Sequence, residues 1–115
     1  MKLIKVVNLE DGRPSTTQAR ARLASELQRA RESGVAILKV IHGYGSSGSG
    51  GVLCAGIRKS LRLRIKEGKA VALIPGEHFS SDANETRHLL LRHPVLRQDR
   101  DLNRGNPGIT IVELS

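Results

Sequence analysis

The residues best suited to chemistry lie in one stretch, Ile41 to Gly51, where a histidine precedes a run of glycines and serines. Five of these eleven residues are glycine, so the backbone can approach a ligand closely. Uncovered amides ahead of a helix N-terminus are suited to binding phosphate. Because imidazole titrates near neutrality, His42 is a candidate general acid or base. The stretch predicts a phosphate-binding loop whose contact residues are Gly43, Tyr44, Gly45, Ser46, Ser47 and Gly48.

Other interpretations of this stretch stay open. The spacing Gly43-x-Gly45-x-x-Gly48 matches the dinucleotide-binding fingerprint, but a complete dinucleotide fold needs a longer chain. No Lys-Ser or Lys-Thr pair follows the glycines, which excludes a Walker loop. The glycines can also form a flexible linker into a helix. His42 can equally be a histidine that hydrogen-bonds to the backbone and shapes the turn.

Hydrophobic periodicity predicts the elements that position the loop. Apolar segments predict four strands, at residues 3–9, 35–41, 70–74 and 109–114, the second of them buried on both faces. Apolar residues three or four apart predict helices over about 16–33 and 52–67, and a short one over 84–92. Residues 97–104 alternate in charge and predict a surface loop. The order β-α-β-α-β-insert-β predicts an α/β two-layer sandwich. It has four strands and two main helices, with the loop at the C-terminal edge of the second strand.

The charge of the chain points to polyanionic partners. Nineteen Lys and Arg against eleven Asp and Glu give a net charge of +8, which favours nucleic acid, acidic proteins or, less well, anionic lipid. Residues 35–69 hold seven basic residues and a single acidic one, Glu67. The second main helix is expected to present four cations on its outer face, Arg58, Lys59, Arg62 and Lys66. The first three join the loop as predicted nucleic-acid contacts, although such a face can also be merely solubilising.

The composition also argues against several classes of protein. No apolar run approaches the about 20 residues of a membrane span, and the first residues are too short and charged for a signal peptide. The single Cys54 permits no internal disulfide, so the cytoplasm is the expected compartment. His78, His88 and His93 show no metal-ligand spacing, and no metal site is predicted. With one Tyr, one Phe and no Trp, stacking of successive bases on aromatic platforms is not expected.

Two segments resemble a known family. A strand that ends in Ile-His-Gly-x-Gly (41–45) precedes an amphipathic helix and a strand, and the chain closes with Gly-Asn-Pro-Gly-Ile-Thr-Ile-Val-Glu-Leu (105–114). These features resemble the Smr (small MutS-related) domain. The resemblance implies a four-stranded mixed sheet, in a fold similar to the C-terminal domain of translation initiation factor three. It also implies binding of DNA or RNA and, in some members, endonuclease (often nicking) activity. It predicts a single domain over residues 1–115, with residues 77–104 as an insertion atypical of the family.

The resemblance also implies candidate catalytic residues. Members usually carry Leu-Asp-x-His-Gly at the end of the first strand, where residues 7–12 here read Val-Asn-Leu-Glu-Asp-Gly. Asn8 therefore replaces the acid and Glu10 the histidine. If the domain cleaves a phosphodiester, His42 is expected to polarise a phosphate oxygen or protonate the leaving group. Glu10 would then activate water, with Mg²⁺ as a candidate cofactor. Binding is better supported than cleavage. A protein- or ribosome-interaction module and a nucleotide-phosphate-binding domain remain alternatives.

Overall fold

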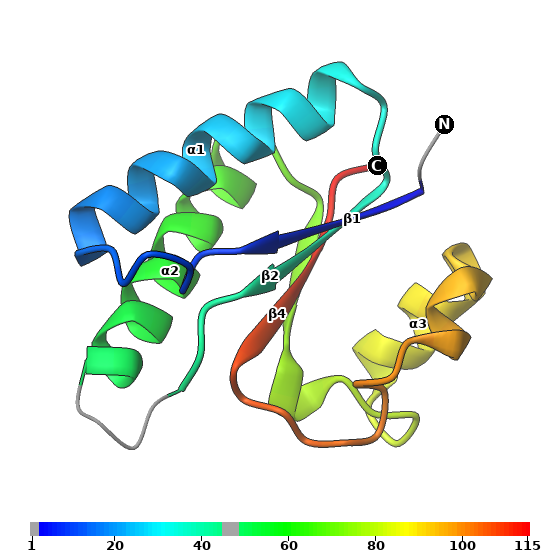
Figure 1. Ribbon diagram of the computed structural model, residues 1–115. Coiled ribbons are helices and arrows are strands. Elements are labelled where there is room, and N and C mark those ends of the chain that lie inside the picture. Colours follow the sequence, from blue (N-terminus) through cyan, green and yellow to red (C-terminus); the bar gives the residue numbers. More distant parts are fainter. Residues whose placement is uncertain (1–2, 45–48) are drawn as a thin grey trace.

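The computed structural model describes residues 3–44 and 49–115. Its main elements, in chain order, are β1 (Ile4–Asn8), α1 (Thr16–Glu32), β2 (Ile37–Ile41), α2 (Ser49–Lys66), β3 (Ala72–Pro75), α3 (Asn84–Arg92) and β4 (Ile109–Glu113) (Figure 1). Two short 3-10 helices, η1 (Gly76–His78) and η2 (Pro94–Gln98), flank α3. Within the described residues, no helix is both long and apolar enough to cross a membrane.

The four strands form one mixed sheet in the order β1-β2-β4-β3. β1 and β2 are parallel, whereas β4 is antiparallel to both of its neighbours. The predicted fold class is confirmed: a four-stranded mixed α/β sheet with two main helices. Residues 37–40 of β2 are all buried, as expected for a strand covered on both faces.

Helix α1 begins where the sequence supplies a capping box. The Ser15 side-chain oxygen accepts from the backbone N–H of Gln18 at 3.1 Å, and Gln18 Oε1 accepts from the backbone N–H of Ser15 at 2.9 Å. These bonds satisfy two amides that a helix start leaves without partners. The buried stripe Ala19, Leu23, Leu27 and Ala30 then packs α1 against the sheet.

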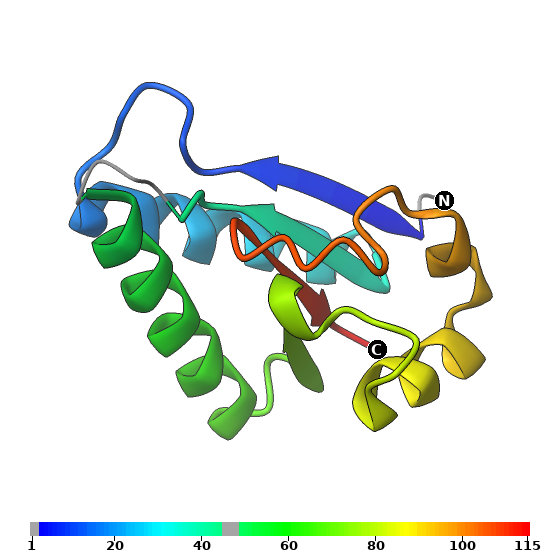
Figure 2. The ribbon, with the colours of Figure 1, turned by 90° about the horizontal axis from the view of Figure 1, so that it is seen from below.

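The two faces of the sheet have separate apolar cores. Leu38 and Val40 of β2 pack with α1 and α2 on one face, while Ile37 belongs to the cluster on the opposite face. That second cluster includes Phe79, Leu89, Leu90 and Leu96 from the segment between β3 and β4. Helix α3 and its neighbours thus lie across the sheet from α1 and α2 (Figure 2), an additional layer that the sequence did not predict.

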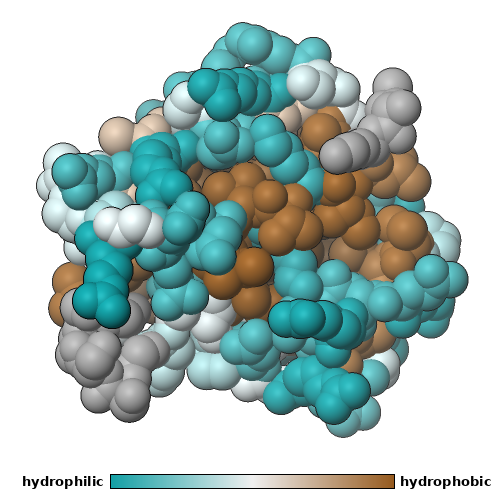
Figure 3. Space-filling model, viewed as in Figure 1, coloured by the Kyte–Doolittle hydropathy of each residue, from teal (hydrophilic) through white to brown (hydrophobic). Residues whose placement is uncertain are grey.

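The segment over 97–104 is not wholly the predicted surface loop. Asp99 and Asp101 turn toward the sheet and pair with Lys39 of β2, whose exposed fraction is only 6%. Burial of a lysine is costly unless a carboxylate compensates its charge, so this part of the segment is drawn onto the sheet. Over β1 the same face stays open, and apolar surface is visible over the strands between α1 and α3 (Figure 3). Val6 of β1 is exposed at 56%.

Strand direction brings four connections to one edge of the sheet. β1, β2 and β3 all end there, and β4, which runs the opposite way, begins there. The edge therefore collects Glu10 after β1, His42 after β2, Glu77 after β3 and Gly108 before β4. The described residues of the predicted loop, Gly43 and Tyr44, follow the C-terminal end of β2.

Candidate nucleic-acid interface

His42 is fully buried beneath this edge. Its Nδ1 lies 2.8 Å from the Gly43 carbonyl oxygen, and its Nε2 lies 2.8 Å from Thr110 Oγ1. A carbonyl only accepts, so Nδ1 carries the proton and the Thr110 hydroxyl donates to Nε2. Burial lowers the pKa of His42, which favours this neutral form. The contacts are those of a histidine that shapes the turn, and they leave neither ring nitrogen facing solvent.

Arg58 is buried as well, with an exposed fraction of 8%. The prediction that it lies on the outer face of α2 is wrong, because it follows Ile57 on the side that packs against the sheet edge. Its Nη1 and Nη2 donate to the two carboxylate oxygens of Glu77 at 2.9 and 2.7 Å. Its Nε donates to Thr110 Oγ1 at 3.1 Å, and Nη2 also reaches the carbonyls of Pro107 and Ile109.

The Arg58 contacts tie together three elements. The guanidinium joins α2 to η1, which follows β3, through Glu77 and to the start of β4 through Thr110. Burial raises the pKa of Glu77, but the hydrogen bonds from Arg58, a backbone hydrogen bond and the neighbouring positive charges together outweigh burial, and the pKa is lowered. Arg58 therefore acts first as a structural cation. A chain of hydrogen bonds runs from Glu77 through Arg58 and Thr110 to His42.

The turn at Gly43 is held from two sides. The backbone N–H groups of His42 and Gly43 both donate to the Gly108 carbonyl at 3.0 Å. Gly43 has φ of +71°, a left-handed backbone conformation that favours glycine. A Cβ there would also meet the Glu10 carboxylate, which is the end of an exposed side chain that can move aside. The structure thus brings Glu10, His42 and Gly43 together, with the Glu10 residue exposed to solvent and the imidazole buried.

The exposed cations of α2 form a separate stripe. Lys59, Arg62 and Lys66 are exposed, and their spacing of three and four residues puts them on one side of the helix. Among the described residues, none of these three takes part in an ion pair, whereas Arg64 pairs with Glu67 at 3.0 Å. We call these three residues the α2 stripe.

The remaining predicted contacts belong to the loop itself. Tyr44 is exposed at 56%. Gly45, Ser46, Ser47 and Gly48 lie outside the described residues. Their roles stay predictions.

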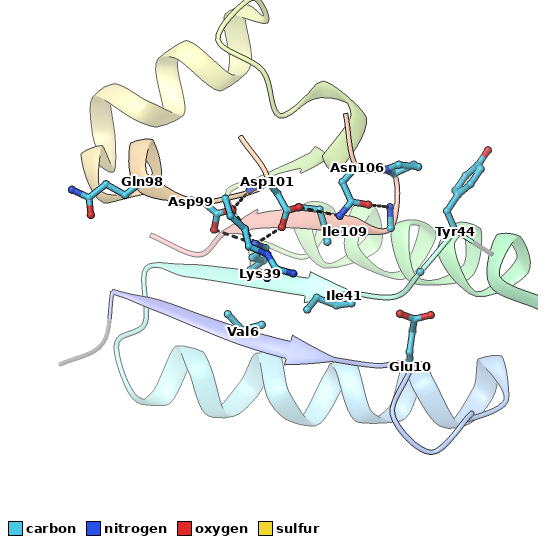
Figure 4. A pocket seen from close by; sticks show the side chains of 14 residues that line it. Val6, Glu10, Lys39, Ile41, Tyr44, Gln98, Asp99, Asp101, Asn106 and Ile109 are labelled. Atoms are coloured by element: carbon cyan, nitrogen blue, oxygen red, sulfur yellow. Dashed lines mark hydrogen bonds and ion pairs between the residues drawn. The ribbon is translucent and has the colours of Figure 1, made fainter. Parts of the chain in front are cut away.

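A cleft of about 820 Å³ opens beside Tyr44, on the sheet face opposite α1 and α2 (Figure 4). Its lining includes residues that the sequence analysis did not single out, namely Lys39, Asp99, Asp101 and Asn106. One signal was available: a lysine inside an otherwise apolar strand requires acidic partners. Across the described residues, no group of three or more His, Cys, Asp or Glu side chains is arranged to hold a metal ion.

Comparison with known proteins finds a matching family and a similar solved structure. Residues 13–115 match the family described as the Smr domain, a range that begins just after Glu10. Among solved structures, the Smr domain of Thermus thermophilus MutS2 is similar, with a TM-score of 0.59 and 22% sequence identity. That match covers 96% of this chain and 98% of the other, and at this identity it shows the shared fold. No match was found among curated proteins.

Proposed function

Because the chain belongs to the Smr domain family, we propose that it binds nucleic acid by contacting phosphates with its His-Gly-x-Gly loop and the α2 stripe. Smr domains generally bind nucleic acids. The observation that carries the proposal for this chain is the α2 stripe. Its three exposed cations have no acidic partner among the described residues, so their charge is available to a phosphate backbone.

The contacts described above support a division of roles within the site. His42 and Arg58 are buried. His42 hydrogen-bonds to the carbonyl of Gly43 in the turn, and Arg58 hydrogen-bonds to Glu77. In the proposal they are positioning residues, which hold Gly43 and the start of α2 at the sheet edge. Lys59, Arg62 and Lys66 are the contacting cations, together with the loop amides, because phosphate recognition needs donors that solvent can reach.

The expected result in solution is binding that weakens steeply with salt. With about three phosphate contacts, affinity should fall about 40-fold between about 50 and 200 mM salt, because each contact releases counterions. Fluorescence anisotropy with labelled DNA and RNA oligonucleotides of equal length measures this directly. Salt-insensitive binding, or no binding to either polymer, would overturn the proposal. Equally tight binding of a mononucleotide would favour a nucleotide-phosphate-binding domain instead.

Phosphodiester cleavage is a second candidate, and the observation that favours it is the position of Glu10. The Glu10 carboxylate lies next to Gly43. The residue is exposed and also lines the cleft. Glu10 is then the candidate base that activates water, while His42 acts by holding the turn.

If the domain cleaves, Glu10→Gln should slow nicking of supercoiled plasmid by about 10²–10⁴-fold, the usual contribution of a general base. Affinity for the same plasmid should stay within about twofold, since no phosphate-binding cation changes. Assays with and without Mg²⁺, on plasmid and on structured RNA, separate a metal requirement from its absence. Intact substrates with wild-type protein under every condition would remove the cleavage candidate and leave binding standing.

A further inference from the structure

We infer that the cleft beside Tyr44 holds one unpaired nucleobase, so that the domain prefers nucleic acid with an unstacked nucleotide to continuous duplex. The inference rests on the proposed function and names the kind of nucleic acid that the site takes. The cleft lies between β1 and β2 on one side and residues 98–109 on the other. Its volume of about 820 Å³ is large enough to admit a base.

The charges that line the cleft do not suit a phosphate. Lys39 Nζ lies 2.9 Å from Asp99 Oδ1 and 2.5 Å from Asp101 Oδ2, so two carboxylates already compensate its single positive charge. Glu10 and Arg100 also line the cleft, which gives three acidic and two basic side chains in all. The lining therefore carries a net charge of −1, which disfavours a phosphate, whereas a base is uncharged and polar only at its edges.

The cleft also supplies a surface for stacking. Tyr44, exposed at 56%, lies at the same end of the cleft as Glu10 with its ring directed away from that carboxylate, and Gln98 lies at the other end (Figure 4). Val6 and Ile41 add apolar side chains from β1 and β2. Stacking of a base on an aromatic ring strengthens binding by about 5- to 100-fold. Tyr44 is the only tyrosine of a chain without tryptophan, which fits one stacked base rather than a series.

Asn106 offers hydrogen bonds in a fixed orientation. Its Oδ1 accepts from the backbone N–H of Gly108 at 2.9 Å, and its Nδ2 donates to Asp101 Oδ1 at 3.0 Å. These two bonds leave one N–H donor and one acceptor lone pair on the amide. A neighbouring donor and acceptor are the groups with which an amide recognises a base edge. The residue is half-buried, so a ligand in the cleft can reach it.

The test compares two duplexes that differ in one base. Both carry a single bulged nucleotide, which is adenosine in one and an abasic site in the other, so their phosphates are identical. Wild-type protein should bind the adenosine bulge about 5- to 100-fold more tightly. Tyr44→Ala should lose this preference, and Tyr44→Phe should keep most of it because the ring remains. Leu91→Ala, at an exposed position of α3, is the control and should behave as wild type.

The outcomes separate this inference from the proposed function. Equal, salt-dependent affinity of wild-type protein for the two bulges would overturn the base site and leave phosphate binding intact. A preference that survives in Tyr44→Ala would also overturn it. Absence of binding to either duplex would instead remove the proposed function. Circular dichroism of each variant verifies that a lost preference does not reflect unfolding.

Discussion

Arg58→Met is expected to destabilise the fold by roughly 3–5 kcal/mol, the usual cost of breaking a buried, hydrogen-bonded charge. Arg58 is 8% exposed and donates to Glu77, to Thr110 and to two backbone carbonyls. Methionine keeps much of the side-chain length but none of the donors. The carbonyls and the Thr110 hydroxyl would then lose a partner in a place that water reaches poorly.

Urea denaturation followed by far-ultraviolet circular dichroism measures this loss, since the chain has no tryptophan to report unfolding. Arg62→Met, one helical turn later and exposed, is the matched control and should change stability by less than about 0.5 kcal/mol. Similar small effects of both substitutions would contradict the structural role of Arg58. In that case its guanidinium would be returned to the set of predicted nucleic-acid contacts.

Lys39→Met is expected to cost a similar amount, roughly 3–5 kcal/mol, because it leaves two largely buried carboxylates without their cation. The side chains of Asp99 and Asp101 are each 12% exposed. Burial would lower the pKa of Lys39, but its hydrogen bonds to Asp101 and Asp99 outweigh that effect and the pKa is raised. Burial likewise opposes ionisation of Asp101, yet Lys39 and Asn106 lower its pKa.

The directions of these two pKa shifts determine the pH range in which Lys39→Met lowers the stability of the fold. The lowered pKa of Asp101 means that its contribution is present above the ordinary value of 3.8 and is lost as pH falls below it. The raised pKa of Lys39 means that its contribution is present below 10.5 and is lost as pH rises through the higher folded value. The difference in unfolding free energy between wild type and variant should therefore be largest near neutral pH.

Lys5→Met provides the control for this experiment. Lys5 pairs with Glu26 at 2.9 Å, but both side chains are more exposed, at 34% and 25%. An ion pair of that kind contributes about 0.2–1 kcal/mol. Urea denaturation is measured at neutral pH and at a pH below the ordinary Asp pKa. Only Lys39→Met should show a large loss of unfolding free energy at neutral pH that becomes smaller at the acidic pH. A deficit that is small at neutral pH, or that grows on acidification, would contradict the buried cluster.

The fold could be predicted from the sequence because its main signals are local. Apolar spacing defines α1 and α2, and an almost uninterrupted apolar run defines β2. The His-Gly-x-Gly motif after β2 then located the sheet edge at which the site lies. Strand pairing of β4 between β2 and β3 depends on contacts far apart in sequence, and only the family resemblance pointed to a mixed sheet.

The parts of the site that were missed depend on partners from distant segments. Arg58 lies next to the apolar stripe of α2, and whether such a position is buried depends on Glu77 beyond β3. His42 is buried against β4, where its Nε2 is hydrogen-bonded to the Thr110 hydroxyl. Asp99 is drawn inward by a lysine 60 residues earlier in the chain. Helical and strand periodicity carry no information about these pairings, since they arise only when the elements pack.

Whether the α2 stripe contacts phosphates, as proposed, is measured most directly by the salt dependence of nucleic-acid binding. The measurement compares wild-type protein with a double variant in which two cations of the stripe are neutralised. Lys59→Gln/Arg62→Gln should lower the slope of log affinity against log salt by about 2, one for each lost phosphate contact. The control is Arg31→Gln/Arg97→Gln, which removes the same charge from exposed positions at the end of α1 and in η2. Its slope should equal that of wild type. Equal slopes for the two double variants would contradict the account.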